Sequence, residues 1–291
     1  MSVPSLRTVA MPALRRRRLL EIKHGARITH SATGRIGLAL GVVVLIVLCA
    51  GLLTPAEPNA VAIQDEYLSP SLTHPLGTDA YGRDQLARLA AGGMASLAAA
   101  ALVLMISLTV ALVVGVASGL AGGFVDAVVM RINDVLLSIP SIVLAMAVIG
   151  ALGPGFVQLV SALSVAYVAT FTRLARAFTV TCRQREDILA ARLAGVPWWT
   201  TVRGHVIPGV AAQLGVVSTL TIGDIVISIA GLSFLGLGIQ PPTAEWGSML
   251  AESQSAFYVA PWLLLAPAAA ILGTAAAVNL IADSLREGDH R

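Results

Sequence analysis

One acidic residue of this sequence lies deep inside a long apolar stretch. Asp224 is the only charged residue of the run Val210–Leu232. Placing a charge in apolar surroundings is costly, so a carboxylate in such a position is a candidate for function. It could line a pathway and attract an ammonium group, or Thr221 or Ser228, one turn away, could hold it in a structural role. The sequence favours the structural role.

A second candidate cluster combines glycine with short polar and charged side chains. Its members are His74, Gly77, Thr78, Asp79, Gly82, Arg83 and Asp84. Short side chains of this kind favour tight turns, and the guanidinium of Arg83 can bind a carboxylate or a backbone carbonyl. Two interpretations stay open. The segment is either a loop that caps itself, which the residue types favour, or a contact surface for an external protein.

The stretch 179–208 contains the signals of two short helices. Asp187 is a plausible N-cap for a helix Ile188–Ala194, Gly195 can end it in a left-handed conformation, and Pro197 can open the next helix. Small and apolar residues of this stretch suit docking in a groove of a partner, and the tryptophans add large anchors. These residues are Leu189, Ala190, Ala191, Trp198 and Trp199. A helix lying on lipid headgroups is the equally weighted alternative.

A third group of residues follows the run that contains Asp224. Gly236 and Gly238 suit the end of a helix, and Pro241–Pro242 prevents its continuation. Trp246 is expected at the outer membrane interface, where tryptophan is common.

Signatures of catalysis and of nucleotide or metal binding are missing from the sequence. No G-x-x-x-x-G-K-[ST] phosphate loop occurs, so we expect neither ATP binding nor any other cofactor in this chain. The five histidines are scattered without the spacing of a metal site. No nucleophile and base stand out as a pair, and we therefore expect a protein that is not an enzyme.

The composition indicates that these candidate residues belong to a membrane protein. Only 12% of the residues are charged and 56% are hydrophobic, against about a quarter and roughly half in soluble domains. Two cysteines provide no disulfide framework, and basic residues without interleaved aromatic residues argue against nucleic-acid binding. Six apolar blocks are near the length of a membrane span. They are Ile36–Leu53, Gly93–Leu120, Val135–Leu152, Phe156–Phe178, Val210–Leu232 and Val259–Ile281.

These blocks predict an all-α, six-helix membrane domain over 36–291, preceded by a basic segment over 1–35. The connecting segments include an external loop over 54–92 and a cytoplasmic loop over 179–208. With both termini in the cytoplasm, seventeen Lys and Arg residues lie inside and only Arg83 and Arg88 lie outside, as the positive-inside rule requires. Pro140 predicts a kink in the third block, and Gly153–Gly155 a tight hairpin after it.

Three motifs carry a resemblance to a known family. Leu189-Ala190-Ala191, Gly195 and the run from His205 to Pro208 are similar to the cytoplasmic loop of bacterial ABC importer permeases, although that pattern usually begins with Glu rather than leucine. The cluster His74–Asp84 and the stretch Gly231–Gly247 resemble signatures of the C-type permease subunit of dipeptide, oligopeptide and nickel importers. The second signature includes Ser233, Phe234, Gly236, Gly238, Gln240, Pro241, Pro242 and Trp246.

The resemblance implies a type I ABC importer permease in the bacterial inner or plasma membrane. It further implies that the loop 179–208 forms coupling helices that sit in a cleft of an ATPase subunit. The expected partners are a homologous B-type permease subunit, two ATPase subunits that bind ATP and Mg²⁺, and an external solute-binding protein. The cargo would be a peptide or a similar small solute, with nickel and haem also open. A transporter or channel working alone is the alternative, but it would need no folded cytoplasmic loop and usually shows repeated halves.

Overall fold

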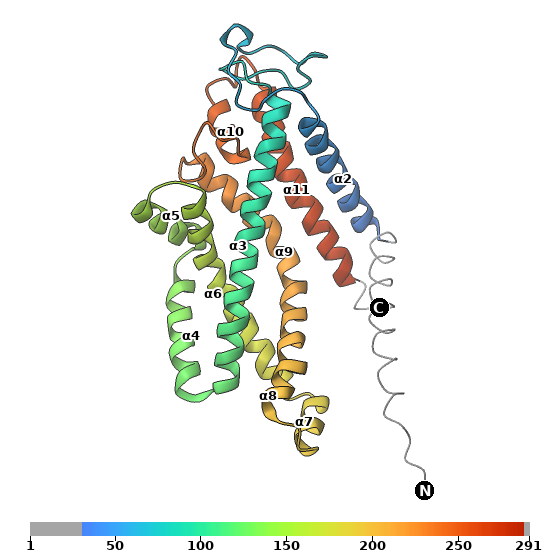
Figure 1. The fold of residues 1–291 in the computed structure, drawn as a ribbon, viewed down its shortest axis with the longest axis vertical. Helices are drawn as coiled ribbons and strands as arrows, with labels where there is room; N and C mark the ends of the chain where they lie inside the picture. The colour runs from blue at the N-terminus through green and yellow to red at the C-terminus, as the bar shows by residue number, and fades with distance from the viewer. Residues whose placement is uncertain (1–30, 288–291) are drawn as a thin grey trace.

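The computed structural model describes residues 31–287 and, of their side chains, those up to Ser284. Most of the basic segment expected over 1–35 therefore lies outside the described residues. Within them, every regular element is helical (Figure 1). The helices are α2 (Ala32–Leu52), η2 (Ile63–Asp65), α3 (Gln85–Ala121), α4 (Gly123–Ser138), α5 (Ser141–Leu152), α6 (Phe156–Cys182), α7 (Glu186–Leu193), α8 (Trp198–Thr201), the π-helical η3 (Val202–Val206), α9 (Ile207–Phe234), α10 (Trp246–Ser253) and α11 (Trp262–Glu287).

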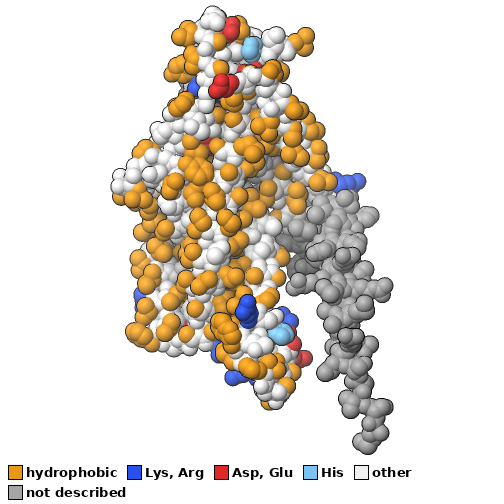
Figure 2. All heavy atoms as spheres, viewed as in Figure 1, with side chains coloured by type: hydrophobic (Ala, Val, Ile, Leu, Met, Phe, Trp, Pro, Cys, Tyr) orange, Lys and Arg blue, Asp and Glu red, His pale blue; other side chains and the backbone are white. Residues whose placement is uncertain are grey.

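The long helices form an elongated bundle with different structures at its two ends. Helix α3 runs through the centre, α6 and α9 pack against it, and α2 and α11 lie side by side along one flank (Figure 1). The segment 53–84 and α10 cover one end, and α7 and α8 project from the other. Apolar side chains cover most of the visible flank, and charged side chains gather toward the ends (Figure 2). This distribution is the one expected of a protein surrounded by lipid.

Among the described residues, five helices are long and apolar enough to span a membrane, and a bent pair makes a sixth candidate. The pair is α4 and α5, which meet at an angle of 90°. Proline at 140 has no backbone N–H and disfavours a helical conformation of the residue before it, and Ile139 is extended, with φ −99° and ψ 128°. The expected kink is therefore a complete break, and the expected third span is two helices.

Local capping residues determine where several helices begin and end. Asp84 accepts a hydrogen bond from the amide of Ala87 at 2.8 Å, which starts α3 at Gln85. The external loop expected over 54–92 is consequently shorter, because its last residues are helical. At the end of α9, Gly236 has φ +77° and the amide of Leu237 donates to the carbonyl of Leu232 at 2.9 Å. This arrangement confirms the glycine-dependent helix end.

The packing of α3 against α6 depends on small residues. A Cβ atom added at Gly115 would lie 2.5 Å from the Cβ of Ala175, and one added at Gly119 would lie 2.8 Å from the Cβ of Thr179. Such glycines, four residues apart, let two membrane helices approach closely. This close contact packs the C-terminal half of α6 directly on α3. The segment that follows α6 therefore begins next to α3.

Candidate functional site

The segment α7–α8 forms a compact tip at one end of the bundle. Ile188 anchors it, because its side chain is 1% exposed and packs in a cluster with Val202, Val206 and Phe171. Gly195 has φ +73°, and the amide of Val196 donates to the carbonyl of Ala191 at 3.1 Å. The glycine stop expected after the first helix is therefore confirmed, and Pro197 directly precedes α8.

The N-cap expected at Asp187 is wrong. Arg185 occupies the cap position of α7 with an extended backbone, and Asp187 lies in the first turn. There its carboxylate interacts favourably with the positive end of the helix dipole and pairs with Arg185 at 3.0 Å. Burial works to raise the pKa of Asp187, but the hydrogen bond and charge of Arg185 outweigh it, so this pKa lies below the usual value of an aspartate.

The outer surface of the tip is apolar and exposed. Leu193 is 90% and Trp199 68% exposed, and Leu189, Val196 and Trp198 are also exposed. Ala190 is exposed among them, Ala191 is half-exposed, and the guanidinium of Arg192 lies over the Trp198 ring. His205 and Pro208 are exposed farther along, near the start of α9. Contiguous apolar patches at the end of a folded element mark surfaces for another protein or for lipid.

Two arginines whose contacts the sequence did not reveal hold the end of α6, next to the tip, against α3 and α4. Arg183 donates through Nη1 to the carbonyls of Gly119 and Leu120, at 2.8 and 3.2 Å. These carbonyls end α3 and have no helical partners of their own. Arg176 pairs with Asp126 of α4, which also accepts from the hydroxyl of Ser118 at 2.6 Å. These contacts join the end of α6, from which the tip extends, to α3 and α4.

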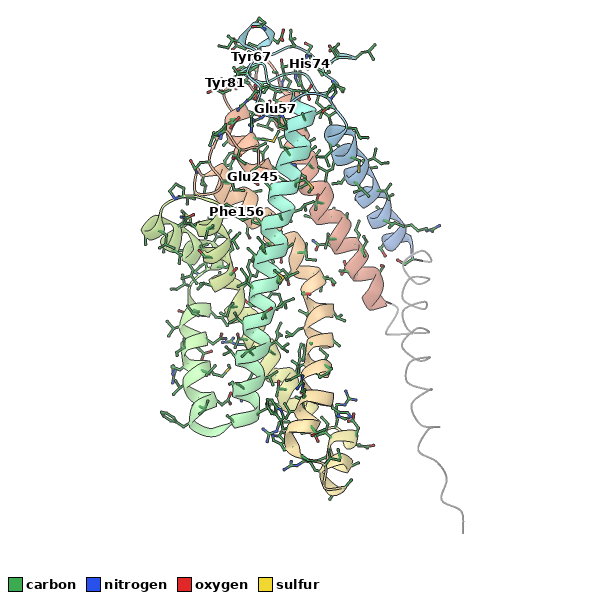
Figure 3. All side chains as sticks on the ribbon, viewed as in Figure 1. Glu57, Tyr67, His74, Tyr81, Phe156 and Glu245 are labelled. Atoms are coloured by element: carbon green, nitrogen blue, oxygen red, sulfur yellow. The ribbon has the colours of Figure 1, made fainter. Side chains whose placement is uncertain are left out.

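The second candidate cluster folds upon itself at the opposite end of the molecule. Oδ1 of Asp79 accepts from the amides of Tyr81 and Arg83, at 2.9 and 3.0 Å, and Oδ2 accepts from Nε of Arg83 at 2.6 Å. His74 lies 2.9 Å from the carboxylate of Asp84. Gly77 and Gly82 have positive φ, and the buried hydroxyl of Thr78 accepts from the amide of Leu68 at 2.9 Å. Figure 3 shows His74 and Tyr81 at this end.

Glu252 of α10, which the sequence did not mark as a partner, connects this cluster to that helix. Oε2 of Glu252 accepts from Arg83 at 2.7 Å and from Arg88 at 3.0 Å. The two arginines are 5% and 1% exposed, so both charges are almost completely buried. They line a cavity of about 150 Å³ together with Tyr67 and Asp79. Arg83, which was expected to bind a carboxylate, therefore binds two, those of Asp79 and Glu252. The motif caps itself.

The group after α9 also has a structural role. Trp246 is completely buried and donates from its indole nitrogen to the carbonyl of Leu89 at 2.9 Å. Its expected place at the outer membrane interface is wrong, because α10 folds back into the bundle. Glu245, labelled in Figure 3, is buried as well and caps α10, accepting from the amides of Gly247 and Ser248 at 3.0 Å. Its other oxygen accepts from Ser96 at 2.7 Å.

The remaining members of this group surround the turn between α9 and α10. Gln240 donates to the carbonyls of Gly236 and Gly238, both at 3.0 Å. Ser233 is buried against Gly238, whereas Phe234, Pro241 and Pro242 are exposed. The residues of this motif form the connection and do not converge on a ligand site.

Asp224 is not held as expected. The hydroxyl of Ser228 donates to the main-chain carbonyl of Asp224 at 2.7 Å, and that of Thr221 points to the carbonyl of Val217 at 3.5 Å. The carboxylate itself is exposed and has no hydrogen bond or ion pair to any side chain of residues 31–284. In the same described part of the chain, no three His, Cys, Asp or Glu side chains could jointly hold a metal ion.

Comparisons with known proteins agree with this arrangement. Residues 111–287 match the family described as "Binding-protein-dependent transport system inner membrane component". The nickel transport system permease protein NikC of Escherichia coli K12 is 35% identical over 262 residues, which cover 88% of this chain and 94% of that protein. The glutathione transport system permease protein GsiD of Shigella flexneri is 42% identical over 218 residues, which cover 75% and 72% of the two chains.

This is a family of multi-pass inner membrane transport components rather than of enzymes. The exposed tip, the apolar flanks and the spans of the structure fit that description. The chain therefore belongs to the binding-protein-dependent transport system inner membrane components, and it is a transmembrane permease subunit of an ABC importer of the dipeptide, oligopeptide and nickel family.

Proposed function

We propose that this chain forms half of a translocation path for peptides or similar small solutes. A homologous but different permease subunit forms the other half, and an external binding protein delivers the solute. Two ATPase subunits bind ATP and Mg²⁺ and supply the energy, since this sequence has no phosphate loop of its own. The relatives named for nickel and for glutathione support a small solute as the cargo.

The apolar tip is the observation that carries this proposal. Leu193 and Trp199 have no reason to be so exposed unless another surface covers them, and the small residues Ala190 and Ala191 allow that surface to come close. Arg183 and Ile188 fix the tip to the membrane helices. A partner that moves the tip would therefore move the bundle. This is the property required of a coupling element between an ATPase and a membrane path.

The orientation follows from charge. Arg183, Arg185, Arg192 and Arg203 lie in or next to the tip in the sequence, whereas the opposite end contains only Arg83 and Arg88. We propose that the tip and both termini are cytoplasmic and that the segment 53–84 is external. Cysteine labelling tests this in spheroplasts: Leu72→Cys should react with an impermeant maleimide and Leu193→Cys should not. Both residues are almost fully exposed, so the reverse pattern would overturn the orientation.

Copurification tests the proposed partners. The tagged chain, extracted in mild detergent, should bring down two ATPase subunits and a second permease subunit. Leu193→Glu should lose the ATPase subunits, because it places a charge in the docking surface and removes about 1.5–3 kcal/mol of apolar burial. Leu72→Glu is the matched control, since it makes the same change at an equally exposed leucine at the other end.

Two results would contradict the proposal. ATPase subunits retained in full by Leu193→Glu would show that the tip is not their docking surface. A chain that transports alone, without any ATPase subunit, would favour a transporter or channel of its own.

A further inference from the structure

Helix α9 leaves one stripe of its surface uncovered by the rest of the chain. Helices α3, α6, α10 and α11 pack against its other faces. Along the stripe, Val216 is 55%, Ile227 47% and Phe234 40% exposed. Their spacing of eleven and seven residues keeps them on one face of the helix. Asp224 is exposed on the same face, three residues before Ile227.

The position of Asp224 is incompatible with a lipid environment. Helix α9 has 28 residues and is about 42 Å long, and Asp224 lies about 15 Å from the end marked by Phe234. A carboxylate at such a depth costs several kcal/mol against hydrocarbon. Among the side chains of residues 31–284, none pairs with it, and we infer that its partner is water or another polar group. The stripe therefore faces water or another polar group.

Two hydroxyl groups accompany the carboxylate. Ser228 follows Asp224 by one turn, and its Oγ lies 3.3 Å from the hydroxyl of Tyr167 on α6. Tyr167 is half-exposed, and Ser228 connects it to α9 at Asp224, because the Ser228 hydroxyl also donates to the Asp224 carbonyl at 2.7 Å. The patch thus combines one negative charge, two hydroxyl oxygens and an aromatic ring, supplied by two different helices.

We propose that Asp224, Tyr167 and Ser228 form a binding site on the translocation path for the protonated amino group of the solute. This inference rests on the proposed function and specifies the chemistry of the path. A single carboxylate with two hydroxyls and an aromatic ring suits an ammonium group, which donates hydrogen bonds to oxygen atoms and makes cation–π contacts. A divalent metal ion prefers more ligands than one carboxylate and two neutral oxygens supply.

The site is tested with charged thiol reagents in the assembled complex. Ile227→Cys, in a Cys49→Ala and Cys182→Ala background, places one thiol beside Asp224. The probes are the trimethylammonium-ethyl and the sulfonato-ethyl methanethiosulfonates, which differ mainly in charge. Reaction needs water and a thiolate, so a thiol in lipid reacts slowly with both. Leu272→Cys, 64% exposed on the flank of α11, is the lipid-facing control.

The charge preference of the reaction is the measured quantity. The cationic probe should modify Ile227→Cys faster than the anionic one, either in the complex without nucleotide or in the complex with Mg²⁺ and ATP. Asp224→Asn should reduce the ratio of the two rates by about tenfold, because the attraction of the cation and the repulsion of the anion disappear together. The control thiol should react slowly with both probes in either background.

Two results would overturn the inference. No modification of Ile227→Cys in either background would show that the stripe is sealed, as in an ion pair with the second permease subunit. A rate ratio that Asp224→Asn leaves unchanged would show that the carboxylate does not attract cations. Copurification of the ATPase subunits in the same preparation separates these failures from a failure of the proposed function.

Discussion

Glu252 joins two buried arginines, and its removal should open the external segment. In Glu252→Gln the side chain keeps its shape but loses its charge. Arg83 and Arg88 then share only the carboxylate of Asp79, which lies 2.6 Å from Arg83 and 3.4 Å from Arg88. One positive charge is left without compensation in a site that excludes most water. The segment 53–84, which Arg83 fastens to α10, should therefore detach more often.

The size of the effect follows from burial. Breaking a fully buried ion pair costs about 3–5 kcal/mol, whereas exposed pairs contribute about 1 kcal/mol or less. The side chain of Glu252 is 25% exposed and both arginines are nearly inaccessible, so a cost of about 2 kcal/mol lies between these limits. At about 1.4 kcal/mol per factor of ten, the open population should rise roughly 30-fold.

Trypsin, which cleaves after lysine and arginine, measures this population directly, because Arg83 and Arg88 are the only such residues between 54 and 92. In nanodiscs, cleavage after Arg83 should be about 30-fold faster in Glu252→Gln than in the wild type, since proteolysis follows the open population when reclosing is fast. Mass spectrometry of the resulting peptides distinguishes this site from others. Glu66→Gln is the matched control, an exposed carboxylate of the same segment. Equal cleavage rates in Glu252→Gln and the control would refute the reasoning.

Three further predictions concern buried contacts. Trp246→Phe loses a buried hydrogen bond and should lower the unfolding temperature in detergent by several degrees, whereas Trp199→Phe, on the exposed tip, should leave it within error. Gly82→Ala should accelerate the trypsin cleavage far more than Gly123→Ala does; both glycines have positive φ, but only at Gly82 would a Cβ strike a backbone carbonyl. Arg183→Gln should reduce the stimulation of ATP hydrolysis several-fold with assembly retained, because it frees the tip from α3.

Features determined by local sequence could be predicted. Gly195 and Gly236 end helices because few other residues adopt positive φ, and Pro140 breaks a helix because it has no amide hydrogen. The self-capping of Asp79 involves residues at most four positions away. The apolar blocks showed the spans, and the motifs led to the correct family, since both depend on residues close together in the chain.

Contacts between distant segments could not be predicted. Glu252 meets Arg83 across 169 positions, and no local pattern marks it as their partner. The same holds for Trp246, whose indole bonds to a carbonyl 157 positions away. Asp224 was expected to be held by hydroxyls one turn away, but in a helix these hydroxyls bond to the main chain instead. Asp187 lost the cap position to Arg185 by a shift of two residues, a scale on which helix ends vary.

The coupling role of the tip is the central claim, and ATP hydrolysis by the complete complex tests it most directly. The complex is reconstituted in proteoliposomes with its binding protein, and hydrolysis is measured with the liganded binding protein present and absent. In Gly195→Pro the ring forces a negative φ where +73° is needed, and Ala190→Trp blocks close approach at the tip. Both variants should insert normally and lose the stimulation seen in the wild type. Full stimulation in both would contradict the account.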